Sequence, residues 1–367
     1  MACISKRRGR LVLDFYDQDG KRQRTTLKKG TTMKSAKEKL REIEDQVSRG
    51  TYIVERKIPA FSEVAKDWLA YKKHNLRETT WEVYEGHIRL HFEELDNLKI
   101  NQITTPVIEQ YITKRQNSGM NIGTLRKILV TLGQIMAYAV RHKYIEYNPV
   151  REAERPRGQG QAGKQTIILT PQQIQKLLSA VEDQKYKTLF MLAIMSGARQ
   201  GELLGLKWGD LDLENNQIHI QRTFNSGRFF DPKTKTSTRK IDLSPMIMLE
   251  LKKWKLACPK TDLDLIFPNE AGQPMNYSNM VQRHFRKALK DAELPNIRFH
   301  DLRHTYASLL IEQGENIKYI QSQLGHSSPM VTLNVYAHLM KSVNQEAACR
   351  LENTIFNATG HKMVTTN

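Results

Sequence analysis

The stretch Arg298–Tyr336 constrains the fold most, because it divides into three short helices whose ends are marked by small residues. Apolar residues recur at helical spacing in its first part, and Gly314 ends that run. A second apolar run stops at Gly325, where a left-handed C-cap is expected. Ser328 and Pro329 then form a good helix start. The stretch therefore predicts packed helices with polar side chains at their joints.

Four polar side chains at these joints suit chemistry on a phosphodiester: His300, Arg303, His326 and Tyr336. A guanidinium binds phosphate through a bidentate fork, and an imidazole can move a proton near neutral pH. A tyrosine hydroxyl, with its ordinary pKa of about 10, can act as a covalent nucleophile when cations or a base assist it. Each residue alone is more often a packing or capping residue. Their joint occurrence is much rarer by chance.

The chain resembles the tyrosine recombinase (phage integrase) family. The family's H-x-x-R, L-G-H and tyrosine positions are matched by His300-Asp301-Leu302-Arg303, Leu324-Gly325-His326 and Tyr336. The family's earlier arginine box is matched at 196–203, which contains Arg199. A family lysine on a β-hairpin is matched by Lys235. Lys233 would point to the same face of a strand, so either lysine could reach DNA, and the resemblance favours Lys235.

The resemblance implies a site-specific DNA recombinase, the integrase of a phage or of an integrative conjugative element. Tyr336 would attack a scissile phosphate and leave a 3′-phosphotyrosyl link with a free 5′-hydroxyl. Arg199 and Arg303 would clamp the phosphate and stabilise the charge of its transition state. Lys235 would be the general acid for the leaving 5′-oxygen.

The two remaining catalytic positions that the resemblance implies are His300, which would assist proton transfer, and His326, which would hydrogen-bond the phosphate. No cofactor is expected, because the phosphotyrosine keeps the bond energy. No metal is expected, because the cationic side chains take the role of the metal ions in two-metal nucleases.

The implied partners are double-stranded DNA attachment sites, both core sites and arm sites, and three further copies of the chain in a homotetramer on DNA. An excisionase and a host DNA-bending protein are further candidate partners. The net charge of +18, of which residues 1–57 contribute +8, independently favours nucleic acid. We expect a location in the bacterial cytoplasm, associated with the nucleoid.

Other classes find little support in the composition. The three cysteines lie far apart and form no C-x-x-C pair, so neither a disulfide framework nor a cysteine zinc site is indicated. No apolar run approaches the length of a membrane span. The length of 367 residues predicts two or three domains.

The first expected domain, residues 1–57, is a small β-rich module with one helix. A strand over 11–15, a turn at Asp19-Gly20 and a strand over 21–27 predict a hairpin. Ser35 is the expected N-cap of the following helix, and Gly50 its end. The resemblance makes this module arm-binding; the alternative is a basic solvated hairpin without specific DNA contacts.

The second expected domain, residues 58–150, is all-α, and the resemblance makes it the core-binding domain. Its second helix should be capped by Thr79 or Thr80, and its last should span 124–144. Three glycines mark a linker over 151–166. Residues 167–345 are the expected catalytic domain, mixed but mainly α, with a small antiparallel sheet.

Residues 346–367 form the expected C-terminal tail. A helix from Val343 would expose Leu351, Ile355 and Phe356. In the resembled family this segment docks on a neighbouring protomer.

Three rival functions remain open at this point. A type IB topoisomerase shares the cleavage chemistry but does not exchange partners. A metalloenzyme could use His300, His304, His326 and His338, although their spacing fits no zinc pattern. A DNA-binding regulator would not need all six catalytic positions. Covalent-adduct trapping with a chelator control and a two-site recombination assay distinguish these functions.

Overall fold

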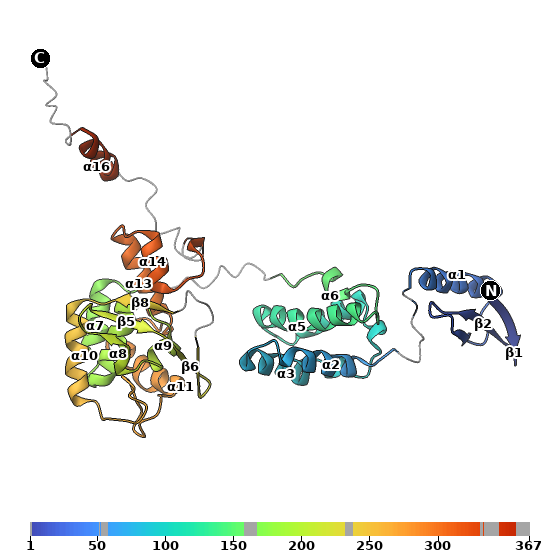
Figure 1. The fold of residues 1–367 in the computed structure, drawn as a ribbon, viewed down its shortest axis with the longest axis horizontal. Coiled ribbons are helices and arrows are strands. Elements are labelled where there is room, and N and C mark those ends of the chain that lie inside the picture. Colours follow the sequence, from blue (N-terminus) through green and yellow to red (C-terminus); the bar gives the residue numbers. More distant parts are fainter. Residues whose placement is uncertain are drawn as a thin grey trace, which may run out of the picture. The chain divides into compact units, whose positions relative to one another are not determined.

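A computed structural model of the chain describes residues 2–50, 52, 58–157, 167–231, 238–330, 333 and 345–356. Contacts divide the chain into one unit over 1–161 and a second over 162–367 (Figure 1). Each unit has its own buried apolar clusters. In the described part of the chain, no helix is long and apolar enough to cross a membrane. The predicted fold class, a multidomain chain with helical regions and small antiparallel sheets, is confirmed.

The N-terminal residues form a three-stranded antiparallel sheet with strand order β1-β2-β3. The strands are β1 (Cys3–Arg7), β2 (Arg10–Tyr16) and β3 (Arg22–Thr26), and helix α1 (Met33–Ser48) packs against β2. Leu13, Phe15 and Ile43 lie in the core between sheet and helix. The predicted β-rich module with one helix is therefore present, and its predicted end at residue 57 lies outside the described residues.

The predicted cap of α1 is wrong. The hydroxyl of Thr32 accepts from the backbone N–H of Ser35 at 3.3 Å, so Thr32 is the N-cap and Ser35 lies in the first turn. Both residue types can cap a helix, and they stand three apart. Local sequence does not choose between them.

The rest of the first unit is helical, as predicted. Its helices are α2 (Phe61–Lys73), α3 (Glu78–His91), α4 (Thr105–Asn117), α5 (Ile122–Arg141) and α6 (Pro149–Glu152). Two short 3₁₀ turns, η2 (Glu93–Leu95) and η3 (Ile100–Gln102), join α3 to α4. The residues predicted to face inward on the last long helix are all buried: Leu125, Ile128, Leu132, Ile135, Met136 and Ala139.

The predicted cap of α3 is also wrong. The helix begins at Glu78, with Arg77 at the N-cap position and no side-chain cap bond, so Thr79 and Thr80 lie inside the first turn. Trp81, on the same helix, donates its indole N–H to the carbonyl of Leu69 at 3.2 Å. This contact joins α3 to α2, a tertiary interaction that local capping preference does not include.

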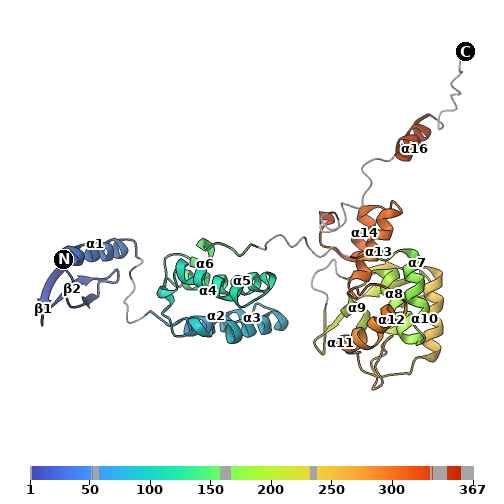
Figure 2. The ribbon, with the colours of Figure 1, turned by 180° about the vertical axis from the view of Figure 1, so that it is seen from behind.

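Helices of the second unit pack around a short sheet. They are α7 (Pro171–Ser179), α8 (Gln184–Ser196), α9 (Gln200–Leu204), α10 (Pro245–Ala257), α11 (Tyr277–Met280), α12 (Arg286–Asp291), α13 (Asp301–Glu312) and α14 (Ile317–Leu324), with a π-helical turn η6 (Val281–Phe285) between α11 and α12. Helix α8 packs against α10 and α13, which can be followed from both sides (Figures 1 and 2). Phe190, Phe285 and Phe299 meet edge to face in the core.

The sheet has the antiparallel order β4-β5-β8. Its strands are β4 (Leu211–Asp212), preceded by the 3₁₀ turn η4 (Trp208–Asp210), β5 (Gln217–Ile220) and β8 (Arg239–Asp242). A separate hairpin, β6 (Thr223–Asn225) with β7 (Arg228–Phe230), lies between β5 and β8 in sequence. Helix α14 packs against β8, which brings the last helices of the unit to the sheet.

Helix α16 (Gln345–Phe356) lies near the C-terminus. Before it, the hydroxyl of Ser328 accepts from the N–H of Met330 at 3.2 Å, as expected of a helix start. The remainder of that expected third helix, including Tyr336, lies outside the described residues.

Candidate active site

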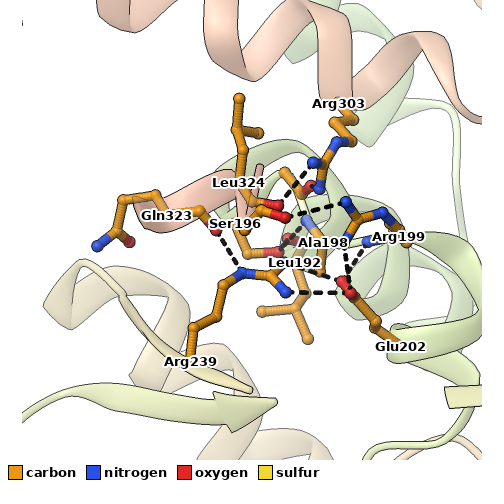
Figure 3. Close-up of polar contacts among 11 residues, drawn as sticks. Leu192, Ser196, Ala198, Arg199, Glu202, Arg239, Arg303, Gln323 and Leu324 are labelled. Atoms are coloured by element: carbon orange, nitrogen blue, oxygen red, sulfur yellow. Dashed lines mark hydrogen bonds and ion pairs between the residues drawn. The ribbon is translucent and has the colours of Figure 1, made fainter. Parts of the chain in front are cut away.

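Arg303 joins the C-terminal ends of two helices. It lies on α13 and is only 4% exposed. Its Nη1 donates to the carbonyl of Gly197 at 2.7 Å, and its Nη2 donates to the carbonyl of Leu324 at 2.6 Å (Figure 3). These carbonyls belong to the ends of α8 and α14, which carry negative partial charge. The cation is therefore held in a fixed position at the meeting point of three helices.

Two glycines let these helix ends approach. Gly197 caps α8 with φ +58°, and Gly325 caps α14 with φ +64°, both in the left-handed region. A Cβ at Gly197 would lie 2.4 Å from Cδ1 of Tyr306. A Cβ at Gly325 would lie 2.9 Å from Cδ and Nη1 of Arg239. Both positions thus require glycine for backbone conformation and for space.

Arg199 follows the first of these turns and is held by a buried carboxylate. Glu202 accepts from the backbone N–H of Arg199 at 2.8 Å and from its Nη1 at 2.9 Å. The Nη2 of Arg199 donates to the carbonyl of Gly325 at 3.2 Å. The side chain of Arg199 nevertheless keeps 39% of its surface exposed. Its guanidinium is therefore oriented and still open to a ligand.

Glu202 binds a second guanidinium on its other side. Nη1 and Nη2 of Arg239 donate to the two carboxylate oxygens of Glu202 at 3.0 and 2.9 Å (Figure 3). Burial raises the pKa of Glu202, but the hydrogen bonds and charge of Arg239, together with the charge of Arg199, outweigh it and lower that pKa to about 2. The carboxylate is therefore ionised at neutral pH, as an arginine clamp requires.

His326 directly follows the Gly325 turn. Its backbone N–H donates to the carbonyl of Gln321 at 3.2 Å, and its own carbonyl accepts from Nε2 of Gln321 at 3.0 Å. Burial, followed by the charges of Arg303 and Arg199, lowers the pKa of His326 to about 4. Its imidazole is therefore neutral at neutral pH and lies within electrostatic range of both arginines.

His300 stands at the N-cap position of α13. Its ring meets that of His304 edge to face, with centroids 5.3 Å apart. Burial, with further effects of His304 and Arg303, lowers the pKa of His300 to about 4. Its imidazole is therefore neutral at neutral pH. The neighbouring Asp301 accepts from the backbone N–H of Arg298 at 2.8 Å and so closes the start of the helix.

The structure brings four of the six expected catalytic residues into one region: Arg199, His300, Arg303 and His326. Lys235 and Tyr336 lie outside the described residues, as does His338. Within the described ranges, no group of three or more histidine, cysteine, aspartate or glutamate residues is arranged to hold a metal ion.

Sequence reasoning missed Arg239. A signal for it existed, because β8 alternates buried and exposed positions and Arg239 shares the buried face with Ile241. A charged residue at an inward strand position indicates a buried partner. The identity of that partner, 37 residues away, was not readable from the pattern.

Comparison with known proteins identifies the family. The Phage integrase family profile matches residues 168–342, and the Phage integrase N-terminal SAM-like domain profile matches residues 60–115. The tyrosine recombinase XerC-like protein of Caldanaerobacter subterraneus subsp. tengcongensis is 30% identical over 343 residues, covering 85% of this chain and 87% of that protein. The ICEBs1 integrase of Bacillus subtilis is 28% identical over 286 residues, covering 74% of this chain and 76% of that protein.

Solved structures share the fold. The integrase of transposon Tn1549 in complex with a circular intermediate DNA matches with a TM-score of 0.69 at 22% identity, over 80% of this chain and 99% of that one. A lambda integrase dimer bound to a COC' core site matches with a TM-score of 0.59 at 18% identity, over 90% of this chain and 93% of that one. The relatives favour a recombinase over the topoisomerase alternative. The chain belongs to the phage integrase family and is a tyrosine recombinase, an enzyme of site-specific DNA recombination.

Proposed function

We propose that this recombinase integrates and excises a mobile element. We also propose that six residues form its catalytic centre: Arg199, Lys235, His300, Arg303, His326 and Tyr336. The observation that carries the proposal is the network in which Glu202 and two helix-end carbonyls fix Arg199 and Arg303. Because protein groups fix the orientation of both guanidinium groups, these groups are preorganised to bind a phosphate.

The proposed cleavage step balances without a cofactor. The hydroxyl oxygen of Tyr336 bonds to the scissile phosphorus as the bond from phosphorus to the 5′-oxygen breaks. His300 assists transfer of the tyrosine proton to water, and Lys235 gives a proton to the leaving 5′-oxygen. Rejoining is the same step in reverse, with a 5′-hydroxyl of the partner strand as the nucleophile.

The phosphate itself is bound by cations and a neutral donor. The exposed guanidinium of Arg199 reaches one non-bridging oxygen, and Arg303 supplies charge from the buried side. Neutral His326 donates a hydrogen bond to the same phosphate. Charge that develops on the oxygens in the transition state is thereby stabilised by donors that are already in position.

The domain roles are part of the proposal. Residues 1–57 bind arm sites, and residues 58–150 bind one face of the core site. Residues 151–166 link the core-binding domain to the catalytic domain. Residues 167–345 cleave the DNA, and residues 346–367 form the C-terminal tail. A homotetramer exchanges two pairs of strands through a Holliday junction. In support, a lambda integrase tetramer bound to a Holliday junction has the same fold, with a TM-score of 0.60. An excisionase, a DNA-bending host protein and nucleoid association in the cytoplasm stay predictions.

Tyr336→Phe tests the proposal. The variant lacks the only proposed nucleophile, so it should bind core-site DNA normally and form no covalent adduct on a nicked substrate that traps the wild-type intermediate. Adducts are measured on a denaturing gel. Tyr319→Phe on α14 is the matched control and should form adducts at the wild-type level. An adduct formed by Tyr336→Phe would refute the assignment.

A further inference from the structure

The buried guanidinium of Arg239 connects three elements of the catalytic unit. Arg239 is the first residue of β8, and its side chain is only 6% exposed. Its Nε donates to the carbonyl of Gln323 in the last turn of α14 at 2.7 Å. Its two Nη atoms donate to Glu202 on α9 at 3.0 and 2.9 Å (Figure 3). One side chain thus spans a strand, a helix end and the carboxylate that holds Arg199.

The same strand is attached to α14 by a second pair of bonds. The backbone N–H of Asp242 donates to Oε1 of Gln323 at 2.9 Å, and Nε2 of Gln323 donates to the carboxylate of Asp242 at 3.1 Å. Three hydrogen bonds thus join strand β8 to the end of α14. The segment that carries Lys235 precedes β8 directly in sequence.

Arg239 also fits closely against the turn before His326. A Cβ at Gly325 would lie 2.9 Å from its Cδ and Nη1, so the guanidinium fills the space under that turn. Arg199 donates to the carbonyl of the same glycine at 3.2 Å. Displacement of Arg239 would therefore disturb Arg199 by two routes, through Glu202 and through Gly325.

We propose that Arg239 is a positioning residue for DNA cleavage. It holds Arg199 in its reactive orientation by two routes, through the carboxylate of Glu202 and through the turn at Gly325. This inference rests on the proposed role of Arg199 as a phosphate clamp. Arg239 acts through other residues and does not itself touch the substrate.

Lysine cannot replace this arginine. An ammonium is a point charge on a flexible stem and cannot bond two carboxylate oxygens and a carbonyl at fixed angles. Arg239→Lys should keep the charge and the fold, bind core-site DNA within about twofold of wild type, and cleave a nicked trapping substrate about 10- to 100-fold more slowly, as expected for a displaced catalytic group.

Arg222→Lys is the matched control, because Arg222 pairs with the buried carboxylate of Asp210 in the same unit. It should lower the melting temperature by a similar amount and leave the cleavage rate near wild type. Equal cleavage defects in the two variants would overturn the inference. Should Arg239→Lys not accumulate as folded protein, Glu202→Asp tests the same link, because its shorter side chain cannot bridge the two arginines.

A double-variant comparison tests whether the effect passes through Arg199. If it does, Arg199→Ala combined with Arg239→Lys should cleave within about threefold of Arg199→Ala alone. Multiplied defects would overturn the inference. A scissile methylphosphonate, which lacks one anionic oxygen, needs less cationic stabilisation, so Arg239→Lys should be impaired less on it than on phosphate. A merely destabilised protein would be impaired equally on both.

Failure of the proposed function has a different signature. Wild-type cleavage by Arg199→Ala would overturn the phosphate clamp and the Arg239 inference together. Slow cleavage by Arg199→Ala with a further independent loss in the double variant would overturn the Arg239 inference alone.

Discussion

At the scale of single residues, Glu202 decides how the candidate site is built. Its carboxylate is 4% exposed and lies between the guanidinium groups of Arg199 and Arg239. A buried charge of this kind is stable only while its partners are present. Removal of the carboxylate leaves Arg239 buried without its main counter-charge, whereas removal of an exposed carboxylate costs little.

Glu202→Gln should therefore lower the free energy of unfolding at pH 7 by about 3–5 kcal/mol. The folded-state pKa of Glu202 is about 2, below the ordinary value of 4.5. The stabilising contribution is thus fully present above about pH 5 and is lost as the pH falls towards 2. Urea unfolding is measured between pH 7 and pH 3, at steps of about one unit. The difference in free energy of unfolding between wild type and Glu202→Gln should shrink as the pH falls.

Glu250→Gln is the control for this experiment. Glu250 pairs with Lys253 at 2.7 Å on the surface, so its removal should cost less than about 1 kcal/mol. If the difference in free energy of unfolding between wild type and Glu202→Gln did not change with pH, the assigned ionisation of Glu202 would be contradicted.

The same scale shows what sequence alone can supply. The positions of Arg199, Arg303 and His326 follow from short motifs, because the residues of each motif are neighbours on one turn or one helix face. The Glu202–Arg239 pair joins residues 37 apart, and it exists only because β8 packs against α14 beside α9. Long-range pairs of this kind need the tertiary fold before they can be recognised.

At the scale of elements, helix ends organise the site. Helices α8 and α14 both end in left-handed glycines, and their terminal carbonyls accept from Arg303 and Arg199. Unsatisfied carbonyls at a helix end need donors, and here the donors are the cations that the chemistry requires. The capping glycines are therefore part of the construction of the site.

Gly325→Ala tests this role. A non-glycine residue at φ +64° costs about 1–2 kcal/mol, and the overlap with Arg239 adds about 1–3 kcal/mol. Gly314→Ala is the matched control, because Gly314 has φ +82° and its Cβ would meet nothing within 4 Å. Chemical unfolding and cleavage assays should show a larger loss for Gly325→Ala in both. Equal effects of the two variants would mean that the contact with Arg239 is unimportant.

Element boundaries were predicted where one residue dominates the local choice. Gly325 ends α14 in the left-handed conformation, as expected. The predicted cap of α1 was wrong because Thr32 and Ser35 can both cap a helix, and that of α3 was wrong because α3 begins after Arg77 without a side-chain cap. The β6–β7 hairpin was missed, although Ser226 and Gly227, with φ +48° and +78°, form the kind of turn that Ser-Gly pairs favour.

At the scale of the whole molecule, charge is concentrated at the N-terminus. Residues 1–57 carry +8 of the net +18. On the sheet, Arg22 and Arg24 both bind Asp14, and their side chains keep 54% and 44% of their surface exposed. The sheet face is thus held in shape while it presents cations to solvent, as an electrostatic DNA contact requires.

Deletion of residues 1–57 should separate the two proposed DNA-binding activities. If the module binds arm sites, the truncated protein should still cleave an isolated core site on a nicked trapping substrate. Its recombination of two complete attachment sites should fall by at least about tenfold, because the removed charges supplied phosphate contacts. If the truncated protein recombined paired sites in one reaction as efficiently as the full-length protein, an arm-binding role would be excluded.

The C-terminal helix α16 bears on assembly. Leu351 is 62% exposed and Ile355 is 52% exposed, and residues four apart share one face of a helix. An exposed apolar stripe on a short helix indicates a partner surface. Since the chain is a tyrosine recombinase and we propose that it works as a tetramer, the natural partner is a second copy of the chain.

Truncation after Lys341 removes this helix and leaves the proposed nucleophile in place. We expect binding of one protomer to a half-site to stay within about twofold of wild type, because the DNA contacts remain. Cooperative binding to paired half-sites should fall by about tenfold, the effect of losing roughly 1.4 kcal/mol of contact between protomers. Leu351→Asp in the full chain should reproduce this loss, whereas Glu352→Gln on the same helix should not. Gel shifts on single and paired half-sites measure both quantities, and unchanged cooperativity in the truncated protein would rule out docking of α16 between protomers.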